Sequence, residues 1–198
     1  MIGGIGSGKS LSVVRRVVES GDNYPLTNFR LKKIKYHRLK LSDIIKTKDG
    51  KSAVNWDFWE KVRTTHKAYS IYLDEAHNII GSRSSMSKQN QLMSRWISQI
   101  RKILSDSKDN HIYVITQKPR RIDVNFRELA QVVIECQKIT KGKDVYIIQR
   151  FYNGFDDYEL AKSGLKKASA KSFFKGNKYF KYYDTGEMVT FKDGEEYL

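Results

Sequence analysis

The chain has 198 residues, enough for one compact domain with a hydrophobic core. Hydrophobic residues make up 39% of it and only two residues are proline, which excludes a disordered or low-complexity chain. Its apolar runs are much shorter than the roughly 20 residues of a membrane span. The N-terminus opens into a glycine-rich loop without a signal peptide. We therefore expect a globular protein that stays inside the cell.

The charge balance is strongly basic. Lys plus Arg total 37 and Asp plus Glu total 22, which gives a net charge of +15. This excess goes beyond what solubility alone favours, so it indicates a polyanionic partner, and nucleic acid is the leading candidate. The alternative is a generally basic surface without a specific partner.

The first third of the chain predicts a loop, a helix and a basic connection. A glycine-rich loop over residues 3–10 leads into a helix over 9–20, whose four valines, Val13, Val14, Val17 and Val18, form an inward face. The helix stops at the turn residues 21–23. Residues 25–29 are a candidate strand, residues 31–46 are densely basic and weakly patterned, and residues 56–62 resemble a short helix.

The middle of the chain predicts buried strands that alternate with helices. Residues 68–73, 111–116 and 131–136 have the β-branched and aromatic composition of buried strands. A helix over 87–104 carries one apolar stripe at helical spacing. This alternation predicts an α/β fold with a mostly parallel sheet flanked by helices.

The character of the sequence changes after residue 138. Strands are predicted over 144–150 and 178–184, with turns at Asn153-Gly154 and at residues 175–177. We expect a single domain over 1–198, with a core over 1–138 and a short β-rich C-terminal extension over 139–198.

Residues 3–10 match the pattern G-x-x-x-x-G-K-[ST] of a phosphate-binding loop. The glycines let successive backbone N–H groups turn toward a phosphate, and the helix that follows directs its positive end at the same place. Lys9 reaches the β- and γ-phosphates, and the Ser10 hydroxyl ligates Mg²⁺. The predicted ATP-binding residues are Gly3, Gly4, Ile5, Gly6, Ser7, Gly8, Lys9 and Ser10.

Two later strand ends complete the predicted site. The apolar strand that ends in Asp74-Glu75 is typical of a Walker B element, with Asp74 as a metal ligand and Glu75 as the general base for water. The alternative is that both acids start a helix. Gln117 follows the next strand and is the candidate sensor of the γ-phosphate. Residues 74–77 also spell a box of superfamily 2 helicases, but no second RecA-like domain fits in the chain, so we interpret His77 as a local hydrogen-bonding residue.

The ordered motifs resemble the HerA/FtsK superfamily of P-loop motors. The resemblance covers residues 1–138 and rests on residues 3–10, 73–77, 100–102, 115–119 and 122–127, and residues 182–187 are similar to a tail motif of the group. Within it, the chain looks most like zonula-occludens-toxin-like phage proteins and archaeal viral genome-packaging ATPases. The resemblance implies a RecA-like P-loop NTPase that forms a homo-oligomeric ring, commonly a hexamer, and moves double-stranded DNA. It also implies an arginine finger in trans, for which Arg101 is the first choice and Arg95 or Arg127 the reserve.

Two features depart from this group. Only Met1 and Ile2 precede the glycine loop, where a full strand is usual, so the central strand is expected to be missing or very short. The toxin-like proteins often carry a membrane segment after the ATPase domain, and this sequence contains no such segment, which favours the soluble packaging type.

We therefore predict an ATP-driven, double-stranded DNA translocase that packages a viral genome in the cytoplasm of an infected cell or in association with the virion. The alternative is a phage assembly or secretion ATPase that acts on a coat protein or a membrane partner. DNA binding should be non-specific and made through phosphate contacts. The candidate DNA contacts are Arg30, Lys32, Lys33, Lys35, Arg38, Lys40, Arg83, Lys88, Lys118, Arg120 and Arg121.

Overall fold

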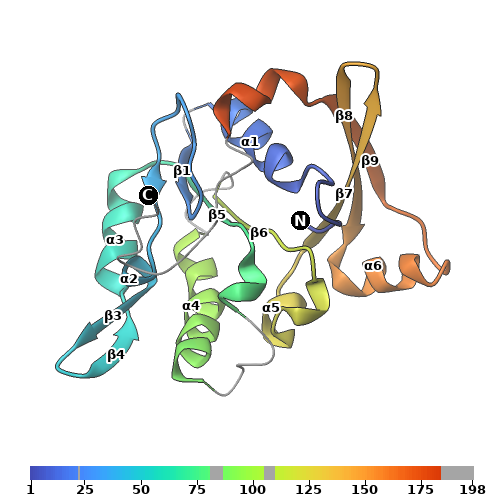
Figure 1. Ribbon diagram of the computed structural model, residues 1–198. Coiled ribbons are helices and arrows are strands. Elements are labelled where there is room, and N and C mark those ends of the chain that lie inside the picture. The colour runs from blue at the N-terminus through green and yellow to red at the C-terminus, as the bar shows by residue number, and fades with distance from the viewer. Residues whose placement is uncertain (22, 81–86, 105–109, 184–198) are drawn as a thin grey trace.

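The computed structural model describes residues 1–21, 23–80, 87–104 and 110–183, with the side chains of residues 101 and 103 left out (Figure 1). The C-terminal tail motif at 182–187 lies mostly outside these residues.

A parallel sheet forms the centre of the molecule, as the alternation of strands and helices predicts. Its strands lie in the order β2 (His37–Arg38), β1 (Tyr24–Thr27), β5 (Tyr69–Leu73) and β6 (His111–Val114). All three pairings are parallel. Every residue of β5 is buried, which explains why four of its five residues are large hydrophobic or aromatic side chains and only Ser70 is polar. Because the strands are parallel, the segments that follow them leave the same edge of the sheet.

The strand before the glycine loop is very short. Ile2 forms parallel bridges to Thr116 on one side and to Glu135 on the other. The Thr116 N–H donates to the Met1 carbonyl at 3.0 Å, and the Cys136 N–H donates to the Ile2 carbonyl at 2.9 Å. These two residues therefore sit where a central strand belongs, between the end of β6 and β7 (Val132–Lys141).

Helices cover both faces of the parallel sheet (Figure 1). On one face α3 (Trp56–Thr65), α4 (Lys88–Leu104) and α5 (Val124–Glu128) contribute to the larger core. On the other face α1 (Lys9–Glu19) packs through its valines. The remaining short elements are α2 (Leu41–Ile44), the hairpin strands β3 (Ile45–Lys48) and β4 (Lys51–Val54), η1 (Ala76–Asn78) and η3 (Pro119–Arg121).

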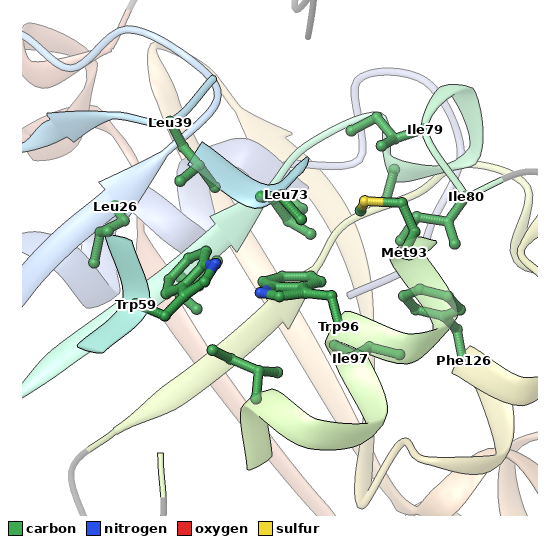
Figure 2. Packing of buried hydrophobic residues seen from close by; sticks show 14 of the residues in the cluster. Leu26, Leu39, Trp59, Leu73, Ile79, Ile80, Met93, Trp96, Ile97 and Phe126 are labelled. Carbon is green, nitrogen blue, oxygen red and sulfur yellow. The ribbon is translucent and has the colours of Figure 1, made fainter. Parts of the chain in front are cut away.

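The larger core is centred on two tryptophans. Trp59 of α3 and Trp96 of α4 are fully buried with ring centroids 5.4 Å apart, and Figure 2 shows the two rings side by side. Ile79 and Ile80, which follow η1, are buried in the same cluster. This packing anchors the turn after β5, and that turn carries the acidic residues of the predicted site.

The C-terminal part is an antiparallel sheet with a helix. β7, β8 (Asp144–Asn153) and β9 (Ala170–Lys175) pair in that order. Ile147 of β8 and Phe174 of β9 are buried in one cluster with the valines of α1. The sheet therefore packs against the helix that follows the glycine loop.

Two predictions for this part were wrong. The described part of 178–184 is not a strand, because residues Asn177–Tyr182 form the 3₁₀ helix η4. The Asn177 side chain accepts from the Val145 N–H at 2.8 Å and donates to the Lys143 carbonyl at 2.9 Å, so it ends the β8–β9 ladder, and Tyr179 then packs into the cluster around α1. Asn153-Gly154 does not turn between strands but starts α6 (Gly154–Lys162).

Candidate nucleotide site

The glycine loop has a backbone that only glycine accommodates at two of its positions. Gly8 has φ +88°, and a Cβ there would lie 2.2 Å from Cδ1 of Ile147. Gly3 has φ +147°, and a Cβ there would lie 2.6 Å from the Cys136 carbonyl oxygen. Positive φ and close approach both exclude a side chain. The C-terminal sheet therefore fixes the loop from outside.

Lys9 is buried at the start of α1, and its ammonium group stays within the loop. Nζ donates to the Gly3 carbonyl at 3.0 Å and to the Gly4 carbonyl at 2.9 Å. Burial lowers the pKa of Lys9, and the nearby Asp74 carboxylate partly offsets this. The ammonium group is thus held beside the peptide groups that a phosphate-binding loop presents to its ligand.

Ser10 and Asp74 lie side by side although 64 residues separate them. The Ser10 hydroxyl donates to Oδ2 of Asp74 at 2.6 Å, and the Glu75 N–H donates to Oδ1 at 2.8 Å. Asp74 is only 3% exposed, and burial raises the pKa of its carboxyl group, while these two hydrogen bonds act in the opposite direction. The glycine loop and the end of β5 therefore meet at one point.

Asn28, which the sequence did not single out, positions Asp74. Its side-chain amide donates to the Asp74 carbonyl at 2.9 Å, and its side-chain oxygen accepts from the Asp74 N–H at 2.8 Å. Asn28 follows β1 and is fully buried. Only the parallel pairing of β1 with β5 brings the two residues together, so a local pattern could not reveal this contact.

Glu75 stands on a strained turn and meets Gln117. Its φ of 48° lies in the left-handed region, which is uncommon for a residue with a side chain. Nε2 of Gln117 donates to Oε1 of Glu75 at 2.5 Å. Two candidates from separate strand ends are therefore in direct contact.

The donor set of the site fits the predicted metal. A hydroxyl and a carboxylate offer only oxygen ligands, which Mg²⁺ prefers, and such an ion is usually held by one or two protein groups together with phosphates and water. Ser10 and Asp74 already touch, so both can reach one ion.

A cavity of about 410 Å³ opens against the glycine loop. One wall is formed by residues 3–7, and the other comes from β7 and β8. Gln137, Lys138 and Arg150 in the second wall were not predicted as site residues. Arg150 is oriented by Gln137, whose Oε1 accepts from its guanidinium at 2.8 Å. The cavity has room for a ligand larger than a phosphate group.

The structure describes the side chains of two of the three candidates for the arginine finger. Arg101 belongs to α4, but its side chain lies outside the described residues. Arg95 is exposed on the same helix. Arg127 is half-buried with its guanidinium 5.1 Å from the Phe155 ring centroid.

Most of the candidate DNA contacts follow the carboxyl ends of the parallel strands. Residues 30–35 belong to the connection from β1 to β2, Arg38 lies in β2, and Lys40 follows β2. Residues 118–121 follow β6, so this group and the start of the β1–β2 connection leave the edge of the sheet that carries the glycine loop. Arg83 lies outside the described residues. Arg120 donates to Glu159 at 2.9 Å, and Arg38 is half-buried. The exposed candidates are Arg30, Lys32, Lys33, Lys35, Lys40, Lys88, Lys118, Arg120 and Arg121.

A comparison with protein families decides the family. The model of the ATPase family associated with various cellular activities (AAA) matches residues 1–138, which is more than half of the chain. The chain belongs to the AAA family. It is therefore an ATP-hydrolysing enzyme, and the match contains the glycine loop, Asp74, Glu75 and Gln117.

Among solved structures, one neighbour supports the fold of this AAA ATPase, and a second is less similar. The N-terminal domain of zonular occludens toxin from Neisseria meningitidis has 21% sequence identity and a TM-score of 0.57, covering 92% of this chain and 96% of that one. The genome packaging NTPase B204 from Sulfolobus turreted icosahedral virus 2, solved with ATP-gammaS, has 13% identity and a TM-score of 0.46, covering 92% and 94%. No curated protein matches the sequence. Within the described residues, no helix of this ATPase has the length and apolar character to cross a membrane.

Proposed function

We propose that the chain is an ATP-driven double-stranded DNA translocase that packages a viral genome. The observation that carries the proposal is the meeting of Ser10 with Asp74 and of Glu75 with Gln117 at the sheet edge from which the basic segments emerge. The order of motifs along residues 1–138, similar to that of HerA/FtsK motors, and the net charge of +15 support the same function.

The site residues have separate tasks in this proposal. The N–H groups of the glycine loop hold the triphosphate of ATP. The ammonium group of Lys9 moves from the carbonyls of Gly3 and Gly4 to the β- and γ-phosphates of ATP. Ser10 and Asp74 hold Mg²⁺, which neutralises phosphate charge when bound. Glu75 accepts a proton from the attacking water, and Gln117 contacts the γ-phosphate or that water. The glycine loop thus binds the triphosphate, and the residues that follow β5 and β6 activate and position the attacking water.

The DNA-binding surface belongs to the carboxyl edge of the parallel sheet. Basic side chains from the segments after β1 and β6 contact phosphates there without reading bases, as a motor that moves along any sequence requires. Movements at the nucleotide site then act on groups that hold DNA.

The assembly is a homo-oligomeric ring, a hexamer in this proposal, with DNA at its centre. A neighbouring subunit supplies an arginine that stabilises charge on the transferring phosphoryl group, and Arg101 is the first candidate. The protein acts in the cytoplasm of the infected cell or bound to the virion.

An ATPase assay with and without duplex DNA tests the proposal. We expect duplex DNA to stimulate turnover of the parent chain. Lys9→Ala should abolish turnover and weaken nucleotide binding, because it removes the phosphate ligand. Glu75→Gln should lower turnover by about a hundredfold or more with nucleotide binding retained, because only the proton acceptor is lost. Unchanged hydrolysis in either variant contradicts the site assignment.

The same assay distinguishes the other function that the sequence suggested. Addition of a coat protein or of anionic lipid vesicles in place of DNA tests an assembly or secretion ATPase. Stimulation by one of these additions, together with no effect of duplex DNA, overturns the translocase proposal in favour of a protein or membrane partner.

A further inference from the structure

The turn after β5 places a histidine beside the proposed base. His77 lies in η1, two residues after Glu75, and its Nδ1 is 3.3 Å from Oε2 of Glu75. The other carboxylate oxygen of Glu75, Oε1, accepts from Gln117. Each oxygen of this carboxylate therefore has its own partner, one on η1 and one after β6.

His77 is also connected to the end of β6. Its Nδ1 lies 3.2 Å from Oγ1 of Thr116, and the Lys118 N–H donates to the same Oγ1 at 3.1 Å. Nδ1 thus faces a carboxylate, which only accepts when ionised, and a hydroxyl, which can either donate or accept. An unprotonated Nδ1 would turn a lone pair toward Oε2 of Glu75, so the carboxylate favours the proton on Nδ1, and the two side chains are in polar contact at 3.3 Å.

The surroundings hold this imidazole in place. The side chain of His77 is 13% exposed, and that of Glu75 is 26% exposed. The Ala76 N–H donates to the Ile115 carbonyl at 3.0 Å, and the buried Ile79 and Ile80 anchor the chain just after η1 (Figure 2). A side chain that is largely covered and sits on an anchored turn has little freedom to point elsewhere.

We propose that His77 is a positioning residue for ATP hydrolysis, which holds the Glu75 carboxylate through Nδ1–H and ties its orientation to Thr116. This inference rests on the proposed role of Glu75. A carboxylate held only by Gln117 can rotate about its terminal bond, and misplacement of a general base by about 1 Å is worth up to about a hundredfold in rate.

The test compares His77→Ala with His77→Asn in the full chain. We expect His77→Ala to lower kcat for ATP about tenfold or more, with KM for ATP within about twofold of the parent value, since no contact to the nucleotide is removed. The side-chain amide of asparagine can occupy the place of Nδ1–H, so His77→Asn should recover most of kcat. A loss caused by misfolding would not be restored in this way.

His111→Ala is the matched control, because it removes an exposed imidazole at the opposite end of β6. It should leave kcat unchanged. Parent-like kcat in His77→Ala, or a loss that His77→Asn does not restore, overturns the inference. Glu75→Gln measured in parallel separates the proposed role of Glu75 from that of His77. If Glu75→Gln keeps full turnover, the proposed role of Glu75 is wrong. If Glu75→Gln is inactive but His77→Ala keeps the parent kcat, only the positioning role of His77 is wrong.

Discussion

The burial of Asp74 at the candidate nucleotide site lowers the folding stability of the chain at neutral pH. Burial raises the pKa of its carboxyl group above the usual 3.8, so the folded chain holds this proton more tightly than the unfolded chain. Between the usual and the raised pKa, stability falls as pH rises. At neutral pH the ionised Asp74 therefore makes the free protein less stable than a neutral group in its place would.

We expect Asp74→Asn to raise the melting temperature at pH 7, without nucleotide and with EDTA, because asparagine is uncharged and can still accept from the Glu75 N–H. The gain should shrink as pH falls from the raised pKa toward 3.8, and it should be lost below 3.8, where the aspartate of the parent chain is protonated in both states. Thermal melts across this range measure it. Asp57→Asn, at an exposed carboxylate, serves as control. Equal melting temperatures of parent and Asp74→Asn across the range contradict the argument.

At the scale of elements, the glycine loop depends on the C-terminal sheet. Ile147 of β8 fills the space where a Gly8 side chain would lie, and the carbonyl of Cys136 in β7 does the same at Gly3. The phosphate-binding loop is thus held between its own helix and strands that come more than 120 residues later. The loop conformation is a property of this packing as well as of the glycines.

Gly8→Ala should destabilise the chain by about 1–3 kcal/mol through strain and overpacking. Ile147→Val removes the methyl group in closest contact, so the double variant should lose less stability than the two single losses together. Gly6→Ala is the matched control: φ there is +67° but nothing lies within 4 Å, so it should not couple to Ile147→Val. Urea unfolding measures the free energy of unfolding of all variants. If the losses of Gly8→Ala and Ile147→Val simply add in the double variant, the proposed contact between the two positions is wrong.

At the scale of the whole molecule, the net charge and the sheet topology together determine where a polyanion can bind. A net charge of +15 attracts any polyanion, but the parallel sheet decides where part of that charge gathers, because segments after β1 and β6 leave one edge. The proposed DNA contacts of these two segments therefore begin at the edge of the sheet that carries the candidate nucleotide site.

Duplex DNA binding should fall steeply with salt and depend little on sequence. A protein that contacts about 6–10 phosphates loses about 10³–10⁵ in affinity between 50 and 200 mM salt. Lys118→Ala with Arg121→Ala should make the slope of log affinity against log salt shallower by about 2. Lys61→Ala with Lys67→Ala removes the same amount of charge from α3 and from the amino end of β5. This control variant should change the slope of log affinity against log salt little. Fluorescence anisotropy measures both, and equal slopes would place the contacts elsewhere.

The sequence alone determined the features whose signals are local. The glycine spacing of residues 3–10 marks the phosphate loop, and the apolar strand before Asp74 marks a buried strand with acids at its end. Alternation of such strands with amphipathic helices predicted the parallel sheet, which the fold confirmed. Each of these signals lies within about 20 residues, so neighbouring side chains carry it.

Only the tertiary structure decided the features that depend on distant partners. Asn28 contacts Asp74, and His77 contacts Thr116, because β1, β5 and β6 end at one edge. Residues 1–2 act as a strand because the end of β6 and β7 flank them. Residues 178–182 have the aromatic composition of a strand, yet Asn177 ends the ladder and Tyr179 packs against α1. Strand pairing and burial against remote elements override local propensity there, because the hydrogen bonds and buried area that they supply outweigh it.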